Sequence, residues 1–361
     1  MKKLTALLLA LALCLGLAAC GSNQASPSSN QSSNSTGSSS SASSQASAQQ
    51  DAQSSTEETA SDYKGTDVNI AVLSGPTGIG AVGLMEANDA GETVNRYSFT
   101  VTAANDEVVA GLSNGDYDIA ALATNVASNL YNKTKGGVQI CALNTYGVLY
   151  ILENGDSIQS MSDLAGKTIY ATGQGANPEY VLNYLLTENG LTPGEDVDVE
   201  FMDSETLMTQ MAAGAYEVCM LPVPAVTSVL MQNQDVRVAL DLTDEWNKVT
   251  DEGVLTMGCI VVRTEFAQEN PEAVKAFLEE YAASIESVQS DVEHASQLCE
   301  TYGIVAKAAV AAKAIPDCNL CCVTGADIQP AIEPYYNVLY AANPDSIGGA
   351  LPGEDFYFVA E

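Results

Sequence analysis

Apolar and polar residues alternate with two different periods from about residue 67 onward, and this predicts strands interleaved with helices. Residues 105–115 begin with a residue type that caps helices, carry apolar residues at helical spacing and end on a glycine. A short apolar strand pattern follows at residues 117–122. This order of elements is typical of an α/β fold.

The same pattern occurs twice, at an offset of 99 residues. Residues 204–214 align with 105–115 without a gap, and residues 216–221 align with 117–122. The offset also brings the strand ending at Leu73 onto the strand ending at Thr172, and each is followed by a glycine-rich turn and a helix. Any two α/β units share some pattern, but a gapless match over three elements favours two lobes of one design.

The glycine-rich turns lie at the carboxyl ends of strands, where ligands bind in open α/β sheets. Helix N-termini at these turns present unpaired N–H groups and a partial positive charge. A cleft between two lobes also excludes water when it closes. The sequence therefore predicts a small-molecule cleft between the lobes.

The N-terminus combines Lys2 and Lys3, a short apolar run and the segment Leu17–Cys20. This combination predicts a secretory signal over residues 1–20, and it is too short to span a bilayer permanently. Leu-Ala-Ala before Cys20 resembles the bacterial lipobox, whose cysteine carries lipid; the alternative is an ordinary signal with a chance cysteine. Residues 21–61 are rich in Ser, Asn and Gln and predict a disordered tether. We expect the protein on the outer side of the cell membrane, held there by lipid.

The chain carries a formal net charge of −33, which argues against nucleic acid as a partner. Seven cysteines lie beyond Cys20, mostly within apolar runs, where cysteine is typically a small buried hydrophobe. The cluster at residues 318–322 suggests either a metal or redox site, or one disulfide, Cys299–Cys318 or Cys318–Cys321. Because His294 is the only histidine and no second CxxC pair exists, we expect no metal site.

Three motifs of enzymes occur in an unsuitable context. Residues 78–83 match GxGxxG, but the next strand lacks the acidic residue that binds a ribose. Residues 111–115 match GxSxG, but they end a helix, whereas a nucleophile elbow follows a strand. Residues 161–168 lack the first glycine of a P-loop. We therefore expect no cofactor and no catalytic residues.

Several segments together resemble one family. The lipobox, the serine-rich tether, residues 166–175 and residues 270–281 are similar to periplasmic-binding-protein-like solute receptors of ABC importers. The likeness is strongest to the branch that binds sulfonates, taurine, nitrate and thiamine precursors, and it covers Asp67 to Phe358. It implies a type II fold of two mixed sheets flanked by helices. It also implies a monomer that captures a small solute and delivers it to an ABC permease with its ATPase.

The resemblance further implies that the chain crosses between the lobes twice. Lobe one would hold residues 62–151 and 252–361, and lobe two residues 152–251. The hinge candidates are Asn154-Gly155 and Glu252-Gly253, because glycine absorbs large dihedral changes.

The ligand contacts implied by the resemblance lie in turns after strands and near the crossings. They are Ser74, Gly75, Pro76, Thr77, Gly78, Thr124, Asn125, Tyr146, Gly173, Gln174, Gly175, Ala176, Asn177, Pro222, Val223, Pro224, Trp246 and Met257. Helix capping alone would explain Ser74, Thr77 and Asn177. Tyr146 could belong to the core, and Trp246 to a surface or the cleft.

The three arginines of this region, Arg96, Arg237 and Arg263, lie outside these turns. Recognition should then depend on backbone N–H groups, hydroxyls and tyrosines, which favours a neutral, heteroaromatic or monoanionic ligand such as a sulfonate, a pyrimidine or an aromatic acid. Two alternatives use the same fold: an enzyme like thiamine-pyrimidine synthases or menaquinone-pathway lyases, and a ligand-sensing surface receptor.

Overall fold

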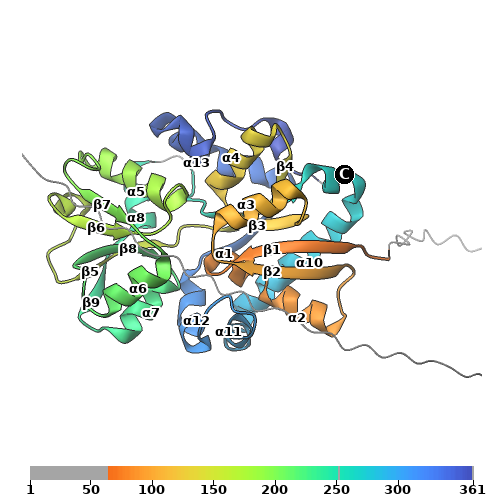
Figure 1. The fold of residues 1–361 in the computed structure, drawn as a ribbon, viewed down its shortest axis with the longest axis horizontal. Helices are drawn as coiled ribbons and strands as arrows, with labels where there is room; N and C mark the ends of the chain where they lie inside the picture. The colour runs from red at the N-terminus through yellow and green to blue at the C-terminus, as the bar shows by residue number, and fades with distance from the viewer. Residues whose placement is uncertain (1–63, 251–252, 360–361) are drawn as a thin grey trace, which may run out of the picture. The chain divides into compact units, whose positions relative to one another are not determined.

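The computed structural model describes residues 64–250 and 253–359, whose strands form two separate sheets (Figure 1). In this part of the chain the first sheet has the strand order β2 (Arg96–Thr102), β1 (Asp67–Leu73), β3 (Ile119–Ala123), β10 (Gly258–Arg263), β4 (Val138–Thr145) and β11 (Leu320–Thr324). The second has the order β7 (Asp198–Phe201), β6 (Thr168–Ala171), β8 (Val218–Pro222), β5 (Leu149–Asn154) and β9 (Val236–Asp241).

Both sheets are built on the same plan. β1 runs parallel to β2 and β3, just as β6 runs parallel to β7 and β8. An antiparallel strand then pairs with the third member of each set: β10 with β3, and β5 with β8. The prediction of two mixed sheets is confirmed. The repeated sequence pattern is a repeated structural unit, because β3 begins at residue 119 and β8 at residue 218.

Helices cover both faces of each sheet. In Figure 1, α3, α4 and α13 lie over one face of the first sheet, and α2, α10 and α11 over the other. The bounds are α1 Pro76–Ile79, α2 Val82–Ala90, α3 Asn105–Asn114, α4 Thr124–Thr134, α5 Asn177–Glu188, α6 Ser204–Ala212, α7 Ala225–Gln232, α8 Leu242–Val249, α9 Thr264–Glu269, α10 Pro271–Ser290, α11 Val292–Thr301, α12 Ala308–Ala314 and α13 Ile328–Ala342. Short 3₁₀ helices lie at Met161–Leu164, Ile315–Asp317, Gly325–Asp327, Pro344–Ile347 and Glu354–Phe356.

The helices pack through the apolar stripes that the sequence shows. On α5, a proline follows Asn177 in the first turn, and the four apolar residues Val181, Leu182, Leu185 and Leu186 are buried. On α10, the residues at positions 274, 277, 281, 285 and 288 are buried in the same way. Each such side chain contributes about 1.5–3 kcal/mol by leaving water. Two apolar clusters result, and each includes strands of both sheets.

The first crossing between the sheets lies between Thr145, where β4 ends, and Leu149, where β5 begins. The expected lobe boundary at residues 151–152 is therefore wrong by a few residues, because Leu149 already pairs with Pro222 in the second sheet. The hinge at Asn154-Gly155 is wrong for the same reason. It lies at the end of β5 that is remote from the crossing, where the backbone N–H of Asn154 donates a hydrogen bond to the carbonyl of Glu217.

The return crossing lies between α8, which ends at Val249, and β10, which begins at Gly258. Glu252 lies outside the described residues. Gly253 has a φ of 73°, a value that glycine adopts without strain, and its carbonyl accepts a hydrogen bond from Trp246. A hinge at Glu252-Gly253 stays a prediction.

Candidate functional site

The predicted contacts at the end of β1 form a turn that is closely held by its neighbours. The N–H of Ser74 donates to the carbonyl of Thr102, and that of Gly75 to the carbonyl of Ile304. Ser74 is exposed, Gly75 and Pro76 are half-buried, and Thr77 is 9% exposed. At Gly78 a Cβ atom would lie 2.0 Å from a backbone oxygen of β1, so only glycine fits. The turn therefore has a fixed shape, and the side chain of Ser74 is exposed on it.

A buried polar contact joins the ends of the two sheets, and Asn177 lies at its centre. Asn177, the first residue of α5, follows β6 of the second sheet and is fully buried. Its amide Nδ2 donates to Thr124 Oγ1 at 2.8 Å and to the carbonyl of Met257 at 2.8 Å. Its Oδ1 accepts from Tyr335 Oη at 2.9 Å and from the backbone N–H of Asn125 at 3.3 Å. We call this set the Asn177 contact.

Thr124 and Asn125 reach the Asn177 contact because α4 begins directly at the end of β3. Both residues are fully buried. Asn125 Nδ2 donates to the carbonyls of Ser346 and, at 3.4 Å, Gly175. Its Oδ1 is buried and has no hydrogen-bond partner among the described residues. A buried acceptor without a hydrogen bond costs about 1–3 kcal/mol of folding free energy. A ligand that donates a hydrogen bond to this oxygen would recover that cost.

The remaining residues of the loop after β6 enclose Asn177. Gly173 is half-buried with its carbonyl bonded to Ala176, while Gln174 and Gly175 are exposed. The N–H of Gly175 donates to the Glu179 carboxylate at 2.6 Å. The side-chain amide of Gln174 is therefore an exposed hydrogen-bonding group of this loop.

Two further predicted contacts lie beside the crossings. Tyr146 is half-buried, and burial raises the pKa of its hydroxyl, with the neighbouring Cys321 thiol adding to the rise. Pro222 and Pro224 are half-buried at the end of β8, and the N–H of Val223 donates to the carbonyl of Val148 at 3.0 Å. Pro222, Val223 and Pro224 lie at the end of β8, directly before α7.

Trp246 and Met257 differ from the expectation. Trp246 is fully buried, its ring packs between Tyr184 and Tyr335 at centroid distances of 5.1 and 5.4 Å, and its Nε1–H donates to the carbonyl of Gly253. Trp246 is therefore buried and not part of the surface, and its contact with a ligand stays a prediction. Met257 is 6% exposed and meets Asn177 through its carbonyl, not its side chain.

The C-terminal residues that complete the Asn177 contact were missed from the sequence. Tyr335 lies on α13, more than 150 positions from Asn177, and Ser346 follows the same helix. Burial raises the pKa of the Tyr335 hydroxyl well above its usual range, so it stays a hydrogen-bond donor. In the sequence Tyr335 stands among apolar helix positions, and only its hydroxyl could have drawn attention to it. Ser346 contributes its backbone carbonyl, which no side-chain pattern predicts.

No arginine reaches the Asn177 contact in the described residues, because the three that we considered are paired elsewhere. The pairs are Arg96–Asp67, Arg237–Glu153 and Arg263–Asp118. The groups that surround the contact are therefore amides, hydroxyls and backbone atoms. Such groups recognise a ligand by hydrogen bonds and not by a charged clamp.

All seven described cysteines are free, which corrects the disulfide considered between Cys299 and Cys318 or between Cys318 and Cys321. Burial raises the pKa of the Cys321 thiol to about 12, so it is protonated at neutral pH. Protonated thiols are weak nucleophiles and poor metal ligands. Within the described residues no group of three or more His, Cys, Asp and Glu side chains could hold a metal ion.

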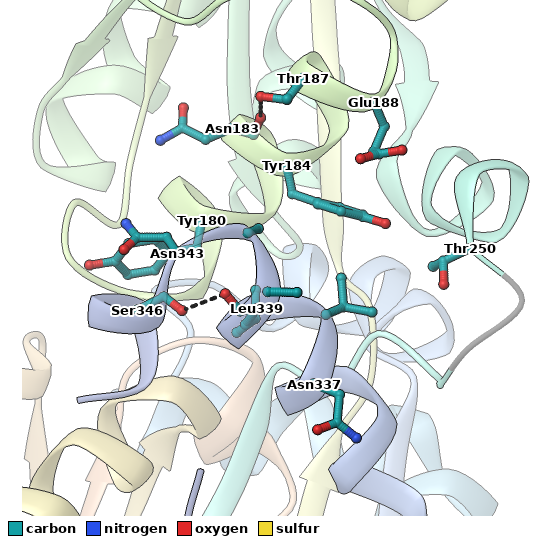
Figure 2. A pocket seen from close by; sticks show the side chains of 13 residues that line it. Tyr180, Asn183, Tyr184, Thr187, Glu188, Thr250, Asn337, Leu339, Asn343 and Ser346 are labelled. Atoms are coloured by element: carbon teal, nitrogen blue, oxygen red, sulfur yellow. Dashed lines mark hydrogen bonds between the residues drawn. The ribbon is translucent and has the colours of Figure 1, made fainter. Parts of the chain in front are cut away.

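Two cavities flank the junction of the sheets. One, of about 650 Å³, lies between α5 and α13 (Figure 2). The other, of about 560 Å³, lies between α7 and α12 and includes Tyr150, Val223 and Lys313 in its wall. Of the predicted contacts, Val223 alone lines either cavity, because the Asn177 contact is closed by its own hydrogen bonds.

Two mixed sheets of one plan, with polar residues of both meeting at their strand ends, define a periplasmic-binding-protein fold. The family model described as "ABC transporter, phosphonate, periplasmic substrate-binding protein" matches residues 92–313. The chain belongs to this family of substrate-binding proteins of ABC transporters.

Solved structures share the fold at low identity. An ABC transporter protein from Parabacteroides distasonis is 21% identical, with a TM-score of 0.67, over 81% of this chain and 99% of that one. The aliphatic sulphonate binding protein SsuA from Escherichia coli is 17% identical, with a TM-score of 0.61, over 81% and 96%. The alkanesulfonate-binding protein SsuA from Xanthomonas axonopodis, bound to MOPS, is 13% identical, with a TM-score of 0.59, over 76% and 93%. No curated protein matches the chain.

No helix in the described part of the chain is both long enough and apolar enough to cross a bilayer.

Proposed function

We propose that this protein is the extracytoplasmic, lipid-anchored substrate-binding component of an ABC importer, and that it captures a small organic solute between its two lobes. The observation that carries this proposal is the Asn177 contact. It brings Asn177, at the start of α5, against Thr124 and Asn125 at the end of β3, with every side chain buried. Opening of the lobes would uncover these groups to a solute, and closing would bury the solute among them.

We infer that the solute is a monoanion or a neutral molecule with hydrogen-bond donors. The family model's description and the solved neighbours name phosphonates and sulfonates, which supports a small organic acid. The absence of an arginine at the contact, within the described residues, argues against a polyanion. Asn125 Oδ1, which has no partner there, favours a ligand that also carries an O–H or N–H group, such as an acid with a hydroxyl or a heteroaromatic ring.

Membrane attachment is the part of the proposal that depends on the N-terminus. Cys20 and the tether at residues 21–61 lie outside the described residues. The sequence around Cys20 supports lipidation, and two acyl chains would give stable anchoring. Replacing Cys20 by Ser should release the protein from the membrane fraction, whereas unchanged retention would contradict a lipid anchor.

Binding is tested by thermal shift against sulfonates, phosphonates, pyrimidines and aromatic acids. A ligand at a hundred times its Kd stabilises the folded state by about 2.7 kcal/mol, which such an assay detects readily. Asn177→Ala should abolish the shift for a true cleft ligand, while Asn247→Ala, at an exposed position of α8, should keep it. A flat screen over all four classes would count against the proposal.

A further inference from the structure

The cavity of about 650 Å³ between α5 and α13 is lined by none of the predicted ligand contacts, and it shares only Ser346 with the Asn177 contact. Its wall includes Tyr180, Tyr184 and Glu188, which follow one another at four-residue steps along α5. Residues at this spacing lie on one face of a helix. Figure 2 shows Tyr184 and Glu188 projecting from α5 on the side of Thr250, and Tyr180 near Asn343. The cavity therefore presents two phenol rings and a carboxylate.

Three helices end at this cavity. Glu188 is the last residue of α5, Thr250 is the C-cap of α8, and Ala342 and Asn343 are the last residue and the C-cap of α13, and all four line the wall. The C-terminus of a helix carries a partial negative charge, because its carbonyl dipoles point outward. Three such ends around one cavity give it a negative potential that favours a cation.

The charged side chains add to this potential. The three helices together carry five acidic residues and one basic residue, Lys248, which is paired with Glu245 at 2.7 Å and does not line the cavity. Glu188 has no ion-pair partner among the described residues. Burial and the nearby carboxylates of Glu179 and Asp345 raise the pKa of Tyr180.

We propose that this cavity is a binding site for a small organic cation that carries an ammonium group. The carboxylate of Glu188 and the helix ends supply the negative charge. The faces of Tyr180 and Tyr184 attract the cation through their π-electrons and cover its alkyl groups. Because α5 follows β6 of the second sheet and α13 packs on β4 of the first, the bound cation contacts helices that belong to both sheets.

The test is a titration of the purified full chain with choline. Trp246 is the only tryptophan, and its ring lies 5.1 Å from that of Tyr184, so its fluorescence reports on this cavity. We expect a saturable change with choline at constant ionic strength. The uncharged isostere 3,3-dimethylbutan-1-ol should give none. Equal responses to the two compounds, or no saturable response to choline by fluorescence and calorimetry, would overturn the proposal.

Variants locate the site. Glu188→Gln should weaken choline binding about fivefold, the size expected for one partly exposed charge pair. Glu333→Gln, which makes the same charge change on α13 outside the cavity wall, should bind as the parent does. Both positions are exposed, so folding is not at risk. Equal binding in the parent and in Glu188→Gln, or binding lost in Asn177→Ala but kept in Glu188→Gln, would refute the assignment. Choline binding and solute capture are tested separately, because Glu188 lies outside the Asn177 contact and Asn177 lies outside the cavity wall.

Discussion

Replacing Asn177 by Ala removes the centre of the Asn177 contact. The change deletes three hydrogen bonds donated by the amide, to Thr124, Met257 and, at 3.5 Å, Thr256. It also deletes two accepted by its oxygen, from Tyr335 and Asn125. The acceptors lose least, because the carbonyl of Met257 still accepts from the N–H of Thr124. The donors lose most, because they stay buried without the oxygen to which they pointed.

The expected cost follows from these two donors. Each buried donor left unsatisfied costs about 1–3 kcal/mol. We therefore expect Asn177→Ala to lower the free energy of unfolding by about 2–6 kcal/mol.

A second substitution, at Tyr335, tests whether the two residues are energetically coupled. In the parent protein, Tyr335→Phe removes one good hydrogen bond and should cost about 1 kcal/mol. In the Asn177→Ala background the same change removes an unpaired hydroxyl, so it should cost nothing or restore stability. Urea unfolding followed by circular dichroism, and by the fluorescence of the neighbouring Trp246, measures all four proteins.

The reasoning fails if the two costs simply add. Additivity would mean that Tyr335 and Asn177 are not coupled, and hence that the bond between them has no energetic role. Asn247→Ala on the exposed side of α8 serves as the control and should change stability by less than about 0.5 kcal/mol.

Three further outcomes are expected. Gly78→Ala should destabilise the fold by about 2 kcal/mol in urea unfolding, because its Cβ would lie 2.0 Å from a backbone oxygen of β1. The hydrogen bond and charge of Glu86 raise the pKa of His294, so this pair stabilises the fold below a pH of about 6.5 and loses its effect as the pH rises through the raised pKa. Glu86→Gln should remove this pH dependence, which amounts to at most about 0.5 kcal/mol of the free energy of unfolding. Burial opposes ionisation of Glu153, but hydrogen bonds and Arg237 lower its pKa overall, so Arg237→Met should cost about 3 kcal/mol at neutral pH and less as falling pH protonates the carboxyl.

Local patterns allowed much of the fold to be predicted. The units at residues 105–122 and 204–221 each carry an apolar stripe, a terminal glycine and a strand, and all of these depend on neighbours in sequence. The predicted caps were wrong by one residue, because Asn105 and Ser204 are the first residues of α3 and α6, whose N-caps are Ala104 and Asp203. The structure places α3 and β3 in the first and α6 and β8 in the second, at the predicted offset. The crossing was placed wrongly because the apolar pattern of β5 does not show which sheet the strand joins.

The candidate site could be predicted only in part. Thr124, Asn125 and Asn177 follow strands and begin helices, so the turn rule brought them together. Tyr335 could not be found, because its contact depends on how α13 packs across the junction. The burial of Trp246 could not be predicted, because α8 is rich in polar residues and the two tyrosines that enclose its ring lie far away in sequence.

The position of β10 determines when each sheet can be completed as the chain emerges from the ribosome or from an export channel. β10, at residues 258–263, lies between β3 and β4, so the earlier strands of the first sheet have no central neighbour until that segment appears. The second sheet is complete in sequence by residue 241. The part of the molecule that begins first along the chain must therefore wait, partly assembled, for the part that begins later.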